Sequence, residues 1–170
     1  MKVVFSFKKK LNMNSTDILI NIRKIVRSIN LESKKIQKDY GVSIPQVLSL
    51  NFLHQSENYQ ATQRELKLFL NLNSSTVTGI IQRLEKKGLI ARLSKSGDKR
   101  LTHLVLTAKG EKLLIQIPPL LHDRLNHKLQ NMNLPDLEEI EKVLEKLVDI
   151  LQISAIDASP LIAIDVDLSI

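Results

Sequence analysis

Apolar residues recur at helical spacing from residue 18 to residue 53. A long amphipathic helix is predicted between the cap candidates Asn14 and Ser15 and the stop at Gly41, because one face carries Ile18, Ile22, Ile25, Ile29 and Ile36. A second helix is predicted from Ser43 to about Ser56. Ser43 and Gln46 have the spacing of a capping box, and Pro45 is tolerated in a first helical turn.

The next two segments have the pattern of a helix-turn-helix. Thr62 and Glu65 repeat the capping-box spacing and open a helix of about two turns, with three residues predicted to point inward: Leu66, Phe69 and Leu70. The stretch NLNSST follows as a turn, in which Asn71 is suited to the left-handed conformation. A further helix then places Val77, Ile80, Ile81 and Leu84 on one face and ends before Gly88.

The second half of the chain continues with a hairpin and further helices. The runs LIARLS and LTHLVL flank the polar segment SGDKR, which predicts a β-hairpin with a basic tip. Helical spacing resumes at Thr107, is interrupted by Pro118 and Pro119, and returns at about Leu121. The last helix starts near Pro135 and has a seam with steps of three and four: Leu137, Ile140, Leu144, Leu147 and Leu151. The fold class is therefore mainly α with a small β-hairpin wing (α+β).

Composition narrows the functional classes. The chain has 170 residues, 43% of them hydrophobic, and no cysteine, which excludes disulfides, thiolate metal sites and thiol nucleophiles. No apolar run is long enough for a membrane span, and the charges of the first residues follow the apolar stretch, the reverse of a secretory signal. We expect a cytoplasmic protein without membrane association.

The charge is distributed unevenly along the chain. Residues 1–110 carry 20 basic and 7 acidic side chains, whereas residues 111–170 carry 5 and 11. Ten of the basic residues and only three acidic ones fall within residues 61–110. A concentrated positive field fits a phosphate-binding surface, and a solvated basic face is the alternative that charge alone leaves open.

Two motifs carry a resemblance to a known family. The stretches STVTGIIQRLEKKGLI and GDKRLTHLVLTAKG run from the second helix of the helix-turn-helix into the wing, and from the wing tip into the next helix. With their flanking helices they resemble the multiple-antibiotic-resistance regulator (MarR) family over roughly residues 14–152. The resemblance implies a winged helix-turn-helix transcription regulator, expected to act as a repressor that binds an inverted-repeat operator as a homodimer.

The resemblance also implies a division of the chain and a DNA-binding surface. Residues 42–106 would form the winged helix-turn-helix DNA-binding region, and 14–41 with 107–153 the helical dimerisation region. Residues 1–13 and 154–170 would be extensions whose alternating pattern fits either strands or frayed ends. The expected DNA-binding residues, with Lys95 and Lys99 assigned by charge and place alone, are Ser74, Ser75, Thr76, Thr78, Gly79, Gln82, Arg83, Lys95, Asp98, Lys99 and Arg100.

The chain departs from the family pattern at two places. Gly79 stands where many relatives have arginine, so base-specific contact is expected to be weaker there, and glycine inside a helix suggests a close approach of the DNA backbone or simple drift. The pair Pro118 and Pro119 interrupts a helix that is often straighter in relatives, which affects the orientation of the lobes.

Other functions are less well supported. The family suggests a small aromatic or phenolic ligand, with Tyr40, His54 and His122 as candidate lining residues, although core or surface roles are more common for residues of these types. His54 and Glu57 share a helical face but do not make a metal site, so we expect no metal and no cofactor. We find no phosphate loop or nucleophile elbow, and therefore expect no enzyme and no catalytic residue. The competing function is a winged-helix module that docks an acidic protein partner without specific DNA binding.

Overall fold

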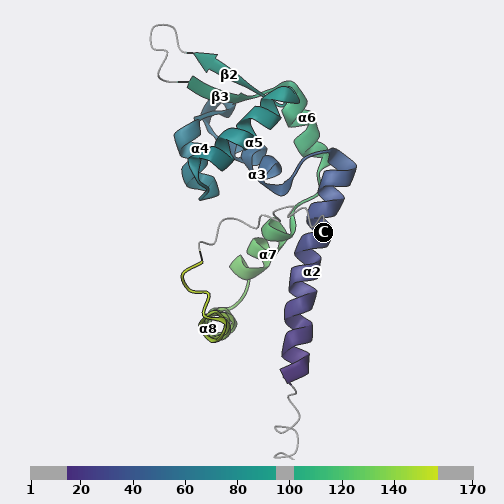
Figure 1. The fold of residues 1–170 in the computed structure, drawn as a ribbon, viewed down its shortest axis with the longest axis vertical. Helices are drawn as coiled ribbons and strands as arrows, with labels where there is room; N and C mark the ends of the chain where they lie inside the picture. Colours follow the sequence, from purple (N-terminus) through teal and green to yellow (C-terminus); the bar gives the residue numbers. More distant parts are fainter. Residues whose placement is uncertain (1–14, 95–101, 157–170) are drawn as a thin grey trace, which may run out of the picture.

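The computed structural model describes residues 15–94 and 102–156. In this part of the chain, helices α3 to α6 and a small sheet form one lobe, and helices α2, α7 and α8 extend away from it (Figure 1). The predicted fold class, mainly helical with a small β component, is confirmed. The terminal segments expected to be strands or frayed ends lie outside the described residues. No described helix combines the length and apolar character needed to cross a membrane.

The helices of the lobe begin where the sequence pattern placed them. Helix α3 spans Ile44–Gln55, α4 spans Gln63–Leu70 and α5 spans Ser74–Lys86. Asn71 ends α4 with φ of 48°, the left-handed conformation expected of the turn. Gly88 follows α5 with φ of 69°, which a residue with a side chain adopts only with strain.

The sheet has three strands, one more than the hairpin that was predicted. Strands β2 (Ile90–Ser94) and β3 (Thr102–Leu106) form the wing, and β1 (Gln60–Thr62) pairs with the other edge of β3. All pairs are antiparallel, with Ala61 opposite Leu104. Residues 57–61 have no strand pattern in the sequence, but β3 offers this segment backbone partners and a buried place for the Ala61 methyl group.

A single apolar core joins α3, α4, α5 and the sheet. Its fully buried members include the inner faces of α4 and α5: Leu66, Leu70, Val77, Ile80, Ile81 and Leu84. Phe69 was expected to point inward with them. Instead 43% of its surface is exposed, and its ring stacks on Phe52 with ring centroids 4.6 Å apart at the edge of the core.

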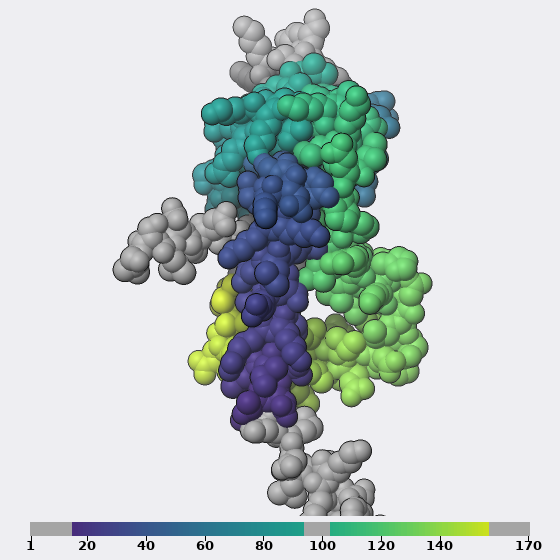
Figure 2. All heavy atoms as spheres, turned by 90° about the vertical axis from the view of Figure 1, so that its right-hand side faces the viewer, coloured from purple at the N-terminus to yellow at the C-terminus, as the bar shows by residue number. Residues whose placement is uncertain are grey.

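Helices α2, α7 and α8 contribute far less to this core. Helix α2 spans Ser15–Tyr40, and among its residues only Ile36 is fully buried. Helix α6 (Ala108–Gln116) packs on α3, but α7 (Leu121–Gln130) and α8 (Leu134–Leu151) contain no fully buried residue. Figure 2 shows open space between the N-terminal half of α2 and the α7–α8 segment, so these helices leave much of their surface uncovered.

Candidate nucleic-acid interface

Helix α5 separates its residues into a buried and an exposed face. Val77, Ile81 and Leu84 are almost completely buried, which fixes the orientation of the helix on the lobe. The Asn73 side chain accepts a hydrogen bond of 2.9 Å from the Thr76 amide and so caps the first turn. The outer face of α5 is therefore presented to solvent in a defined orientation.

Helix α4 is also capped at its N-terminus by side-chain hydrogen bonds. The Glu65 carboxylate accepts hydrogen bonds of 2.7 Å from the Thr62 amide and 2.9 Å from the Thr62 hydroxyl, which lower the pKa of Glu65 below its ordinary value. In return the Glu65 amide donates to the Thr62 hydroxyl. The first helix of the helix-turn-helix thus has a fixed start, as the capping-box spacing predicted.

Most of the expected DNA-binding residues on α5 lie on its outer face. Ser74, Ser75, Thr76, Gln82 and Arg83 are exposed. Thr78 differs from them, because it is half-buried and its hydroxyl group is already bonded twice: it donates to the Ser74 carbonyl and accepts from the Gln63 side chain at 2.9 Å. Thr78 therefore ties α5 to α4 and is less available to a ligand than its neighbours.

The position of Gly79 is filled by a residue one turn further along the helix. A Cβ atom placed on Gly79 would lie 3.8 Å from Nη2 of Arg83 and within 4 Å of no other atom outside its own neighbourhood. The guanidinium group therefore reaches back across the glycine. Among the described residues Arg83 forms no ion pair. Gly79 therefore leaves room for this arginine on the outer side of α5.

The base of the wing is bonded to the end of α5. Arg92 on β2 pairs with Glu85 on α5 at 2.9 Å between Nε and Oε1. The Thr107 hydroxyl group lies within hydrogen-bond distance of the Gly88 and Leu89 carbonyls, and the Lys109 ammonium group donates to the Lys87 carbonyl at 2.7 Å. These contacts hold the strands and α5 as one unit. The expected wing residues Lys95, Asp98, Lys99 and Arg100 lie outside the described residues.

A cleft lies on the lobe where α3 meets the connection between α6 and α7. Its volume is about 500 Å³, and its apolar wall includes Leu48, Phe69, Leu114 and Ile117. The polar lining groups are Asn51, Gln55, His122, Asp123 and Asn126. None of the described lining residues is Lys or Arg, so the cleft offers hydrogen bonds but no lysine or arginine to pair with a carboxylate.

The residues expected to bind a small ligand or a metal ion do not meet at one site. His122 lines this cleft, whereas Tyr40 lines a different surface depression near Lys112. His54 lies 4.0 Å from the Glu111 carboxylate and its ring contacts Tyr59. Within the described part of the chain, no three His, Asp or Glu side chains are grouped as a metal site would need.

Two residues that support the interface were missed by the sequence analysis. Gln63 positions Thr78, and Glu85 positions Arg92. Both contacts join different secondary-structure elements, and neither has a local spacing rule comparable to a capping box. A polar residue on a helix surface gives no sign, in sequence, of which neighbour the fold will bring to it.

Comparison with known proteins relates part of the chain to one family. The family model described as "MarR family" matches residues 42–102, the segment that contains the helix-turn-helix and the wing strands. Transcriptional repressor MprA of Escherichia coli K12 is 29% identical over 114 residues, which cover 67% of this chain and 65% of MprA. Residues 42–102, just over a third of the chain, thus resemble the MarR family in sequence.

Solved structures of MarR proteins share the fold. Staphylococcus aureus MepR in a complex with DNA superposes with a TM-score of 0.59 at 20% identity, covering 76% of this chain and 95% of MepR. NadR in a complex with 4-hydroxyphenylacetate gives a TM-score of 0.51 at 26% identity, covering 78% of this chain and 93% of NadR. The lobe and the extending helices thus recur together in these two structures.

Proposed function

We propose that this chain is a homodimeric transcription repressor of the MarR family that binds an inverted-repeat operator in double-stranded DNA and is released by a small ligand. The observation that carries the proposal is the outer face of α5. It presents Ser75, Thr76, Gln82 and Arg83 to solvent while α4 and the wing strands hold the helix rigidly. MprA is named as a repressor, and MepR is solved with DNA. The protein acts in the cytoplasm and is not an enzyme.

The chemistry of this face suits the major groove. Gln82 offers the bidentate pattern that matches adenine, and Arg83 the pattern that matches guanine or a phosphate. Ser74, Ser75 and Thr76, at the N-terminal end of the helix, contact phosphates through their hydroxyl groups. The wing residues Lys95, Asp98, Lys99 and Arg100 complete the surface, with Arg100 in the minor groove.

The homodimer follows from the uncovered helices. Residues 14–41 and 107–153 form the proposed dimerisation region around the DNA-binding region of residues 42–106. Ile25 on α2 is 58% exposed and Leu144 on α8 is 52% exposed, and both belong to rows of exposed apolar side chains. A partner chain would bury these rows, because contiguous apolar surface is unfavourable in water.

Retardation of duplex DNA from upstream of the protein's own gene tests the proposal. We expect tight, sequence-selective binding that weakens steeply with salt, because counterions are released from the phosphates. Arg83→Ala should lower the affinity about 10- to 100-fold, whereas Arg23→Ala on the exposed side of α2 should not. If the wild-type protein binds no duplex at micromolar concentration in low salt, the proposal fails and the acidic-partner function takes its place.

The cleft beside α3 is the proposed ligand site. Its apolar wall, which includes the Phe69 ring, and its amide groups suit a small aromatic or phenolic molecule, and the lack of Lys and Arg in its lining favours an uncharged phenol over a carboxylate. Calorimetric titration with phenol and with benzoate compares the two directly. Tighter binding of benzoate, or no effect of Asn51→Leu on phenol binding, would contradict this assignment.

A further inference from the structure

The chain between α6 and α7 is not held straight by helical hydrogen bonds. Helix α6 ends at Gln116 and α7 begins at Leu121. Pro118 and Pro119 lie between them and have no amide hydrogen, so the ladder of helical bonds cannot pass through this joint. The direction of α7 relative to the lobe must therefore be set by other contacts.

The lobe side of the joint is fixed by Leu120. This side chain is 2% exposed and belongs to the apolar core of the lobe. Its amide donates to the Asp123 carboxylate at 3.3 Å. One buried side chain locates the start of α7, but rotation about that point is still open.

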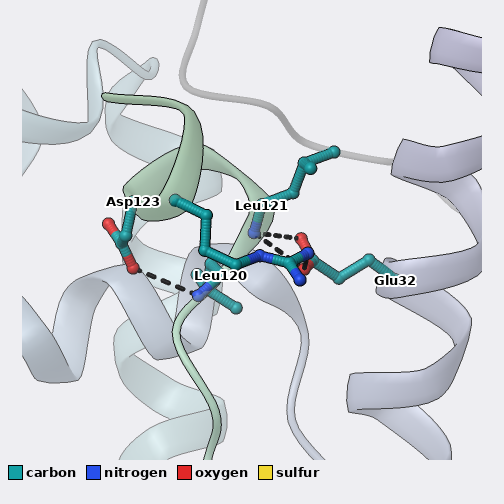
Figure 3. A network of polar contacts seen from close by, with 5 residues as sticks. Glu32, Leu120, Leu121 and Asp123 are labelled. Carbon is teal, nitrogen blue, oxygen red and sulfur yellow. Dashed lines mark hydrogen bonds and ion pairs between the residues drawn. The ribbon is translucent and has the colours of Figure 1, made fainter. Parts of the chain in front are cut away.

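The contact that restricts this rotation comes from α2. Both carboxylate oxygens of Glu32 accept from the Leu121 amide, at 2.7 and 2.9 Å, and one of them also lies 3.2 Å from Nη2 of Arg124 (Figure 3). The Glu32 side chain is only 20% exposed. A carboxylate at this place also interacts favourably with the partial positive charge of a helix N-terminus.

Glu32 is itself rigidly connected to the lobe. Ile36, four residues further along α2, is buried in the lobe core, so about 6 Å of helix separates the core anchor from the carboxylate. Two connections therefore join the lobe core to the start of α7. One runs through Ile36 and Glu32 on α2, and the other through Leu120. Glu32 is 89 residues from Leu121 in sequence.

We propose that Glu32 is a positioning residue, a latch that holds α7 at a fixed angle to the DNA-binding lobe and thereby sets the spacing of the two recognition helices. This inference rests on the proposed homodimeric DNA-binding function. Since α7 and α8 belong to the proposed dimerisation region, any rotation at the joint moves one lobe relative to the other. The latch replaces the continuity that an unbroken helix would supply.

Two variants remove the latch from opposite ends. Glu32→Ala removes the acceptor. Leu121→Pro removes the donor, and the N1 position of a helix tolerates proline when the preceding residue is extended, as Leu120 is, with φ of −64° and ψ of 158°. Asp39→Ala is the matched control, because Asp39 is exposed on the same helix and forms no ion pair with the described residues. Glu32→Gln keeps one acceptor oxygen and should behave between the wild type and Glu32→Ala.

The first readout is independent of DNA. We expect amide exchange at Leu121 to accelerate about tenfold or more in Glu32→Ala, with core amides such as that of Leu66 unchanged. Because the chain has no cysteine, Lys67→Cys introduces a single site on α4 for a spin label. The distance distribution between the two labels of a dimer should broaden in both latch variants and remain narrow in Asp39→Ala.

The second readout is the choice of operator spacing. Adding or removing one base pair between the half-sites should weaken the wild type by about tenfold or more, and the latch variants by about threefold or less. A merely stabilising contact would lower affinity for all spacings alike, and that result overturns the inference. If the wild type binds no duplex, the proposed function fails, and an unbroadened label distance in the variants then overturns the latch as well.

Discussion

Replacing Gly110 with alanine tests how tightly the start of α6 packs on the base of the wing. A Cβ atom at Gly110 would lie 2.2 Å from the Leu89 carbonyl oxygen and 2.7 Å from Cδ1 of Leu106. The leucine methyl group can move aside, but the backbone oxygen cannot move alone. Leu89 is buried and leads directly into β2, so relief of this contact shifts the wing relative to α6.

The expected cost follows from these contacts. Overpacking of this kind costs about 1–3 kcal/mol. The Leu89 oxygen also accepts from the Thr107 amide at 3.2 Å and lies 3.0 Å from the Thr107 hydroxyl, and weakening one such bond adds about 0.5–1.5 kcal/mol. Alanine regains less than about 1 kcal/mol of helix propensity. We expect a net loss of about 2 kcal/mol, or about 4–8 °C in melting temperature.

Gly79→Ala is the matched control for this experiment. It makes the same substitution in a neighbouring helix, where the added methyl group meets only the flexible Arg83 side chain at 3.8 Å. We expect it to stabilise the protein by about 0.5–1 kcal/mol. Urea unfolding of both variants at one protein concentration measures the difference. If Gly110→Ala is as stable as Gly79→Ala, the tight junction between α6 and the wing is not present in solution.

Four further changes have defined outcomes. Leu144→Asp should halve the mass measured by light scattering, because charge cannot be buried in the proposed dimer face; an unchanged mass contradicts that face. Because the pKa of Glu65 is lowered in the folded protein, its contribution to stability is complete above the ordinary carboxyl pKa and is lost as pH falls through the lowered value. The difference in unfolding free energy between wild type and Glu65→Gln, measured by urea titration, should therefore shrink on acidification. Arg124→Ala should change unfolding by less than about 1 kcal/mol, because this partner of Glu32 is 57% exposed. Arg100→Ala should weaken operator binding by about 1–3 kcal/mol and reduce the salt slope by about one in retardation assays, and unchanged binding would place the wing outside the groove.

Local sequence rules predicted the helices because their signals are local. The Thr62 and Glu65 capping box, the left-handed Asn71 and the stop at Gly88 all depend on residues within one turn of each other. Strand β1 has no such signal, because its partner β3 is about forty residues away and its approach requires Asn58 and Tyr59 to adopt positive φ angles of 54° and 57°. Asn58 is a residue type that tolerates positive φ, but Tyr59 is not, so the residue types do not indicate two successive residues in this conformation.

The candidate site was predicted as a face but not as a network. Helical spacing placed Gln82 and Arg83 on the outer side of α5, and the structure has them there. It could not indicate that Gln63 bonds to Thr78, because only the tertiary fold brings the two side chains together. The contact of Glu32 could not be predicted either. In the sequence it is one acidic residue on a charged helix, and only the fold brings the Leu121 amide of α7 to it.

The uncovered apolar rows of α2 and α8 link the stability of the protein to its abundance. If these rows are covered only by a second copy, each tenfold dilution removes about 1.4 kcal/mol from the free energy of the assembled state. A protomer that lacks a partner then exposes side chains such as Ile25 and Leu144 to proteases and chaperones. A cell that makes little of this protein would therefore lose it faster than one that makes much, which sharpens the concentration threshold below which the proposed repression ends.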